Sequence, residues 1–307
     1  MRNAYLSLLY KLARDDERVT SLVADNGLIV YDDFRREFPE RYFNFGISEE
    51  NMVAAAAGMA SCGMIPFVYT ISAFLAYRSY EFLRDDVCLQ NQNVKIVGIG
   101  SGLTYSTLGP SHHTTEDIGL LRSLPNLTVF SPATKLEVEW IMQEAYNING
   151  PVYIRLSNNN KEYYGESQNF SLGVPSVVKK GSDVTLVTTG SIINEAIDAA
   201  SMLEKDGIST EVISMHTLKP LDYRATAKMV SNNGKLVVLE EHNVIGGLYS
   251  AIAEALVAEH ISIPCLGIGL KDKFARDYGS LEAVRKANGL DHMTIYNQIK
   301  DFLVKSM

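Results

Sequence analysis

The sequence predicts an α/β protein of two domains, each a largely parallel sheet flanked by helices. Three observations support this. Short apolar, β-branched runs alternate along the chain with longer stretches of helical periodicity. The runs are continuously apolar, which is typical of parallel strands that helices cover on both faces. A polar segment without periodicity divides the alternation into two series, and this division predicts two domains.

The first series begins with an amphipathic helix. Residues 1–10 are largely apolar but run directly into charged residues, so this start lacks the pattern of a signal peptide. The predicted strands of the series are Thr20–Val23, Ile65–Tyr69, Val94–Ile99, Leu127–Phe130 and Val152–Leu156. The predicted helices cover residues 49–62, 74–91, 116–123 and 134–147.

The second series follows a segment that we expect to be a surface linker. Residues 157–175 are polar, rich in Asn and Gly, and without periodicity. Beyond it the predicted strands are Val184–Thr188, Thr210–Ser214, Leu236–Leu239 and Cys265–Leu270. The predicted helices cover residues 191–206, 222–232 and 246–259. The expected domains are residues 1–165 and 175–307.

Composition and charge exclude several classes of protein. The formal net charge of −8, without a basic run, argues against a nucleic-acid-binding surface. No uncharged stretch is long enough to span a membrane. The three cysteines have no C-x-x-C spacing, which indicates reduced thiols and neither a disulfide framework nor a zinc site. We expect a soluble, cytoplasmic protein that binds no nucleic acid and no membrane.

Two glycine clusters suggest ligand loops. Gly98, Gly100 and Gly102 follow a predicted strand, but a third glycine at the dinucleotide-binding offset and a ribose-binding acid are missing. A loop at a strand end is the better interpretation. Gly246 and Gly247 precede a predicted helix and could cradle an anion at its start, although a tight turn explains them equally well.

Two adjacent acids stand at the predicted start of helix 49–62. Ser48 is the expected N-cap, and Glu49 and Glu50 lie in the first turn, where the helix dipole favours negative charge. Taken alone, such a pair usually consists of surface acids. The expected buried stripe is poor in bulk and comprises Met52, Ala55, Ala56, Met59 and Ala60. Another backbone could approach this helix closely, as at a subunit interface.

Aromatic residues and histidines follow. Phe74, Tyr77 and Tyr80 recur every three residues and predict an aromatic ladder on one helical face. Such a stripe belongs more often to a core than to a cofactor site. His112 and His113 lie in a loop before a predicted helix, and no third ligand stands at a convincing spacing for a metal site.

In order and spacing, these segments are similar to the transketolase family over nearly the whole chain. Residues 46–52 (GISEENM) look like the family's G-I-[AS]-E-Q-[NH]-M segment, and residues 109–112 (GPSH) look like its G-P-T-H loop. Residues 218–222 (LKPLD) and 240–247 (EEHNVIGG) look like parts of its C-terminal domain. The resemblance implies a pyrimidine-binding domain over residues 1–165 and a transketolase C-terminal domain over residues 175–307.

The resemblance also implies thiamine diphosphate as cofactor and assigns roles to residues. Glu49 matches the glutamate that hydrogen-bonds the pyrimidine ring and activates the cofactor. Phe74, Tyr77 and Tyr80 fall on the positions around the aminopyrimidine, where they would supply a low-dielectric wall and a stacking face. His112 matches the histidine that faces the substrate and would act as an acid/base or hydrogen-bond donor.

The family's diphosphate site is missing. Its G-D-G segment, followed by an asparagine pair that helps to hold Mg²⁺, occurs nowhere in this chain. Asn158, Asn159 and Asn160 have no acidic partner upstream. We therefore expect no metal ligands here and an obligate partner, the N-terminal transketolase subunit, which carries the diphosphate-binding domain and the Mg²⁺ ligands. An α2β2 assembly is expected, with the cofactor at the subunit interface.

The positions that bind the sugar also differ from the family pattern. Leu108 replaces an aspartate, and Gly100 and Asn158 stand where basic residues are expected, although Arg155 is nearby. Loss of bidentate phosphate recognition is not a neutral exchange. We expect a small sugar that is not an ordinary pentose or hexose phosphate, or else a phosphate bound by the partner. The expected substrate-binding residues are His112, His113, Arg155 and Asn158.

Three interpretations of function remain. The leading one is a transferase subunit, active only with its partner, that moves a two-carbon ketol unit between sugars. The second is a deoxyxylulose-phosphate-synthase-like activity or a 2-oxoacid dehydrogenase β-subunit, which would use the same cofactor. Release of carbon dioxide from pyruvate would distinguish this second interpretation from the first. The third is a non-catalytic scaffold subunit.

The absence of the G-D-G segment leads to a prediction about the isolated chain. The purified chain alone should bind thiamine diphosphate and Mg²⁺ weakly and show no thiamine-dependent turnover, because half of the site is absent. Co-purification with a partner that contains the G-D-G segment should restore turnover. Tight cofactor binding and turnover by the chain alone would refute the expectation.

Overall fold

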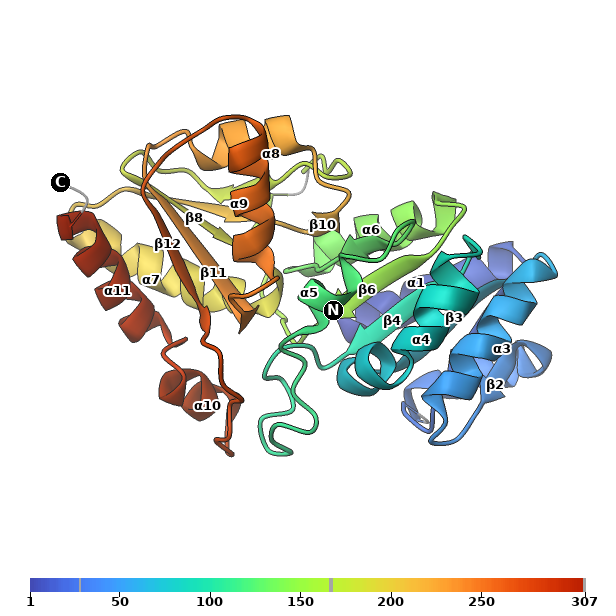
Figure 1. Ribbon diagram of the computed structural model, residues 1–307. Coiled ribbons are helices and arrows are strands. Elements are labelled where there is room, and N and C mark those ends of the chain that lie inside the picture. The colour runs from blue at the N-terminus through green and yellow to red at the C-terminus, as the bar shows by residue number, and fades with distance from the viewer. Residues whose placement is uncertain (28, 166–167, 306–307) are drawn as a thin grey trace.

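The computed structural model describes residues 1–27, 29–165 and 168–305. Two α/β lobes lie side by side, the first drawn from blue to green and the second from yellow-green to red (Figure 1). Within the described ranges, no helix is long and apolar enough to cross a membrane.

The first lobe is a seven-stranded sheet in the order β10-β5-β6-β4-β3-β1-β2. Its strands are β1 (Val19–Val23), β2 (Tyr42–Asn44), β3 (Ile65–Ile71), β4 (Lys95–Ile99), β5 (Thr128–Phe130), β6 (Val152–Leu156) and β10 (Thr217–Lys219). All pair in parallel except β10, which runs antiparallel to β5. β10 lies beyond the linker in sequence, so the second half of the chain completes the first sheet.

Helices cover both faces of this sheet. One face packs against α1 (Arg2–Asp15) and α6 (Lys135–Asn147). The other face packs against α3 (Glu49–Ser61), α4 (Tyr80–Phe82) and the π-helical turns η3 (Phe74–Arg78) and η4 (Leu83–Cys88). The remaining elements are α5 (Asp117–Leu121), α2 (Asp32–Glu37) and the 3₁₀ turns η1 (Ile29–Tyr31) and η2 (Pro39–Arg41).

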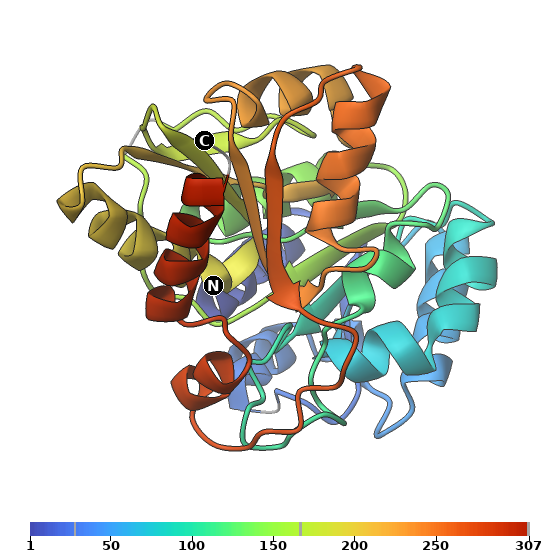
Figure 2. The same cartoon turned by 60° about the vertical axis from the view of Figure 1, so that its left-hand side comes forward.

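The second lobe is a five-stranded sheet in the order β12-β11-β8-β9-β7. Its strands are β7 (Ser176–Lys179), β8 (Val184–Thr188), β9 (Thr210–Ser214), β11 (Leu236–Asn243) and β12 (Cys265–Leu270). Its helices are α7 (Ile193–Lys205), α8 (Tyr223–Val230), α9 (Leu248–Ala258), α10 (Leu281–Ala287) and α11 (His292–Lys305), with the 3₁₀ turn η5 (Gly190–Ile192) before α7. The sheet lies between α7 and α11 on one face and α8 and α9 on the other (Figure 2).

Several predicted elements differ from the structure. Residues 74–91 were expected to form one α-helix but form the two π-helical turns around the short α4. On α3, the buried residues are Glu49, Met52, Val53, Ala56 and Ala57, whereas Ala55, Met59 and Ala60 of the expected stripe are only partly buried. The short strands β2, β7 and β10 and the helices α2, α10 and α11 were not predicted.

The start of the predicted linker is buried between the lobes. The Ser157 hydroxyl accepts a hydrogen bond from the amide of Ser191, and the Asn159 side chain donates to the carbonyl of Ala133 at 2.6 Å. Both residues are less than 10% exposed. The expectation of a surface linker is therefore wrong at its first residues, while Glu166 and Ser167 lie outside the described residues.

A buried ionic cluster joins the lobes. Arg155 on β6 donates through Nε to both carboxylate oxygens of Asp117, at 3.1 and 2.9 Å. Its Nη2 donates to the carbonyl oxygens of Thr114 at 3.0 Å and of Glu241 at 3.3 Å. The Tyr153 hydroxyl also donates to Asp117. Every charge in this cluster has a partner, which buried charges require.

We predict that Arg155→Met lowers the free energy of unfolding by about 3–5 kcal/mol, because Asp117 stays buried without its cation. Urea unfolding can be followed by fluorescence of Trp140, the only tryptophan. Its ring lies 4.9 Å from the ring of His216, centroid to centroid. The control Arg84→Met removes an exposed pair with Asp85 and should cost less than about 1 kcal/mol. Equal losses in the two variants would contradict the prediction.

Candidate functional site

Glu49 lies buried at the start of α3. The chain turns at Gly46, whose φ of 67° favours glycine, and reaches the N-cap at Ser48. Ser48 makes no side-chain capping bond, but its carbonyl accepts from the amide of Met52 at 3.0 Å. Glu49 is 1% exposed, whereas Glu50 is only partly buried. The structure therefore gives the two adjacent acids different environments.

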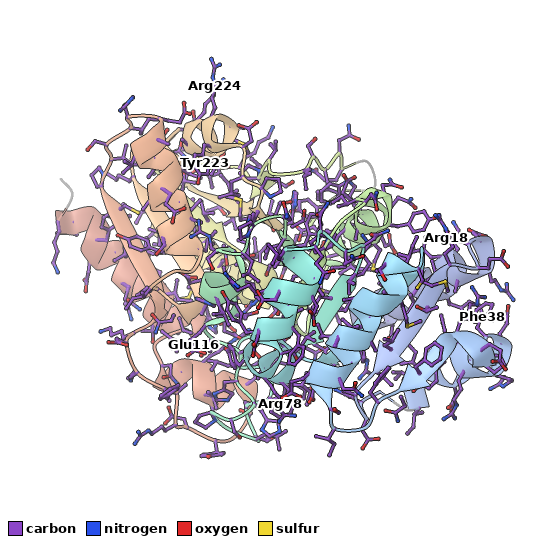
Figure 3. All side chains as sticks on the ribbon, turned by 45° about the vertical axis from the view of Figure 1, so that its right-hand side comes forward. Arg18, Phe38, Arg78, Glu116, Tyr223 and Arg224 are labelled. Atoms are coloured by element: carbon purple, nitrogen blue, oxygen red, sulfur yellow. The ribbon has the colours of Figure 1, made fainter. Side chains whose placement is uncertain are left out.

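Arg78 is the cation that pairs with Glu49. Its Nη1 donates to Glu49 Oε2, and its guanidinium carbon lies 5.1 Å from the centroid of the Phe74 ring. Figure 3 shows Arg78 and Glu116 on the same side of the molecule, away from Arg224. The sequence pattern did not point to Arg78, although it is the only charged residue between Phe74 and Tyr80.

The three aromatic residues do not form one ladder. A π-helix bonds residue i to i+5, so Phe74 and Tyr77, three apart in η3, do not share a face, and Tyr80 lies beyond η3 in α4. Phe74 packs edge-on against His112, with ring centroids 5.1 Å apart. Tyr77 donates its hydroxyl to Glu116 Oε2 at 2.7 Å, and Tyr80 packs against the hydrophobic core. The single-face prediction was wrong, and Phe74 is the aromatic that meets His112.

The two histidines point to different surroundings. His112 is partly exposed, and its Nδ1 lies 3.0 Å from the hydroxyl oxygen of Ser111. His113 is 3% exposed and lines a cavity of about 200 Å³ together with Tyr77, Glu116 and Phe274. Burial lowers the pKa of His113 below the usual histidine value, which favours a neutral ring near neutral pH. Only His112 presents a partly exposed ring beside Phe74.

Residues of the second lobe hold the histidine loop. Gly279 donates its amide to the carbonyl of Ser106 at 3.3 Å, and Tyr278 packs where a side chain at Gly109 would stand. The amide of Leu103 donates to Glu241 Oε1 at 2.8 Å. The loops from the two lobes approach each other at the lower end of the view in Figure 2. The second lobe therefore contributes directly to the position of His112.

Both glycine clusters accommodate side chains of this protein at the places where the sequence suggested ligand loops. A side chain at Gly100 would collide with Tyr105, and one at Gly102 would collide with Glu241, so this loop makes room for protein groups. At the start of α9, the amides of Leu248 and Tyr249 donate to the Glu240 carboxylate at 2.7 and 2.9 Å. The anion held at Gly247 is thus a side chain of this protein. Burial raises the pKa of Glu240 to about 7, although the hydrogen bonds from those two amides act in the opposite direction and lower it.

The structure does not support Arg155 as a substrate ligand. The residue is 2% exposed, and its guanidinium is engaged by Asp117, Thr114 and Glu241. The sequence places an arginine on β6 but does not reveal that its partner, Asp117, lies 38 residues earlier.

Asn158 instead lines a cavity of about 360 Å³. Arg2, Gly100, Tyr105 and Asn160 also line it. Two positions that lack the family's basic residues therefore lie beside a basic residue from the start of α1. Within residues 1–27, 29–165 and 168–305, the side chain of Arg2 makes no hydrogen bond or ion pair. Sequence reasoning missed Arg2 because it stands more than 150 positions before Asn158.

The side chains described above form a continuous series of contacts from Glu49 to the cavity beside Arg2. Glu49 contacts Arg78, Arg78 covers Phe74, Phe74 meets His112, and the His112 ring lies 6.2 Å from that of Tyr105, centroid to centroid. Tyr105 borders the Arg2 cavity. In the part of the chain that the structure describes, no three His, Cys, Asp or Glu side chains are grouped to hold a metal.

Comparisons with known proteins give matches over nearly the whole chain. The family models for the transketolase pyrimidine-binding domain and the transketolase C-terminal domain match residues 1–162 and 173–295. A putative transketolase C-terminal section from Methanocaldococcus jannaschii is 34% identical, over 99% of this chain and 96% of that protein. The 6-deoxy-6-sulfo-D-fructose transketolase subunit SqwH from Clostridium sp. is 34% identical over 94% and 90%. A solved split gene transketolase, described as an inactive beta4 tetramer, is 36% identical with a TM-score of 0.87, over 100% of this chain and 98% of that one.

Proposed function

The chain belongs to the transketolase family, and we propose that it supplies the pyrimidine-binding half of a thiamine-diphosphate site completed by a partner subunit. It is a subunit of a transketolase-like, thiamine-diphosphate-dependent transferase. The observation that carries the proposal is the buried Glu49 at the start of α3, which Arg78 links to Phe74 and which Phe74 in turn links to His112.

The residues around Glu49 fit an aminopyrimidine ring. Glu49 offers a carboxyl group that is shielded from water, and Phe74 offers an aromatic face for stacking. Tyr77 is bonded to Glu116 and Tyr80 packs against the hydrophobic core, so Phe74 is the one of the three aromatic residues that we propose stacks on the ring. When bound, thiamine diphosphate would supply the carbon nucleophile. This chain would orient the pyrimidine ring, with Phe74 on its face and the Glu49 carboxyl holding the proton beside it.

The substrate proposed for this site is a small sugar from which a two-carbon ketol unit is transferred. His112 would donate a hydrogen bond to a substrate oxygen, and the neutral His113 would support the same loop. Asn158 would bind a substrate hydroxyl, and Arg2 would bind an anionic end. The name of one relative specifies a 6-sulfo sugar, which carries such an end. Arg2 thus gives this chain a candidate anion ligand of its own, where the sequence pattern had left either an unusual sugar or a phosphate bound by the partner.

The partner completes the enzyme. We propose that it carries the diphosphate-binding domain and all Mg²⁺ ligands, and that two copies of each chain form an α2β2 heterotetramer. We also propose a cytoplasmic location, which the three free thiols of Cys62, Cys88 and Cys265 favour.

Glu49→Gln should lower kcat of the reconstituted enzyme by about 10²–10⁴-fold, because an amide cannot exchange the proton. Glu50→Gln is the matched control and should stay within about twofold of the wild type, since Glu50 is only partly buried. Initial rates at saturating cofactor measure both variants. A Glu49→Gln enzyme with wild-type kcat would refute the proposed role and favour a scaffold subunit.

Arg2→Gln should raise KM for a sugar substrate that carries a phosphate or sulfonate group by about 10–100-fold, as expected when a charged hydrogen-bond donor is lost. KM for the same sugar without the anionic group should not change. Lys11→Gln, on the same helix and outside the lining of the cavity, is the control. If Arg2→Gln left both KM values unchanged, the anionic end would have to be bound elsewhere, as by the partner subunit.

A further inference from the structure

Arg78 occupies both contacts that the proposed function gives to the aminopyrimidine ring. Its guanidinium donates to the Glu49 carboxylate and lies over the face of Phe74. A guanidinium is planar, donates through N–H groups and stacks on aromatic rings, so it can stand in for a flat heterocycle with an amino group. The two groups compete for the same carboxyl and the same ring face.

The two partners of the pair differ in freedom to move. The Glu49 side chain is 2% exposed and sits at the start of a packed helix, whereas the Arg78 side chain is 38% exposed. A long arginine stem can carry its charged end out to water while its methylene groups stay on the apolar surface. Glu49 cannot follow, so only Arg78 can leave the pair.

The free chain needs such a partner for Glu49. A buried carboxylate without a partner is costly, and the chain by itself has no cofactor ring to satisfy it. In the ion pair, Glu49 accepts a hydrogen bond, whereas a bond to a pyrimidine nitrogen requires the carboxyl group to donate one. The arrangement that stabilises the free chain is therefore not the one that catalysis uses.

We propose that Arg78 caps Glu49 in the uncomplexed chain and swings away when the cofactor binds with the partner subunit. This inference rests on the proposed function, which locates the aminopyrimidine at Glu49 and Phe74. Part of the cofactor's binding free energy is then spent on breaking the Arg78–Glu49 pair, which lowers its apparent affinity.

The test measures thiamine diphosphate affinity by calorimetry on the reconstituted complex at saturating Mg²⁺. Arg78→Ala and Arg78→Gln should each lower the Kd by about tenfold or more, because no cap has to be displaced. The matched control is Arg84→Ala, on the same segment but paired with Asp85, and its Kd should not change. An unchanged or higher Kd in the Arg78 variants would overturn the proposal, since Arg78 would then be neutral or would hold the cofactor.

A second measurement uses the free chain without cofactor. Arg78→Ala should lower its melting temperature because Glu49 becomes unpaired, and Glu49→Gln added to Arg78→Ala should recover most of the loss. No loss in Arg78→Ala would contradict the cap. If the wild-type complex bound no thiamine diphosphate, the proposed function would fail, while the melting temperatures would still report on the pair.

Discussion

The loop that carries His112 depends on Glu241, a carboxylate that comes from the other lobe. Glu241 is 4% exposed, pairs with Arg285 and accepts the amide of Leu103. A buried acid is tolerated only while its partners stay in place. A shift of the loop at Leu103 would therefore remove a hydrogen bond from a buried carboxylate. The contacts of this carboxylate extend through Arg285 to Glu195 and Ser191 at the start of α7. The second lobe therefore helps to fix the position of the loop that carries His112.

The site lies where the sheet of the first lobe ends. Phe74 follows β3, the histidine loop follows β4 and Asn158 follows β6, and these three strands are neighbours in parallel. Parallel strands bring their carboxyl ends to one edge, where ligands of α/β proteins bind. Residues far apart in the sequence therefore meet without long loops. The start of α1 reaches the same edge, since the nitrogen of Met1 donates to the carbonyl of Asn159.

Local patterns predicted most of the sheets, because a continuous apolar run is a property of neighbouring residues. Val152–Leu156 and Thr210–Ser214 have the predicted bounds. The pattern failed where distant partners decide the outcome. β10 forms only because β5 offers an open edge, and Arg155 is buried only because Asp117 meets it. The aromatic ladder failed for a local reason, since intervals of three assume an α-helical turn and η3 is a π-helix. Motif order gave Glu49 and His112, but nothing in the order predicted Arg78.

The crossing of β10 has a consequence for where this chain can be cut. Removing everything after residue 165 would strip β10 from β5 and leave Thr128–Phe130 as an unprotected hydrophobic edge, a template for aggregation. It would also divide the hydrophobic core, which runs without a break from Met52 in the first lobe to Leu236 in the second. The two lobes are thus one unit of folding. Dividing the chain between them would expose that strand edge and open that core.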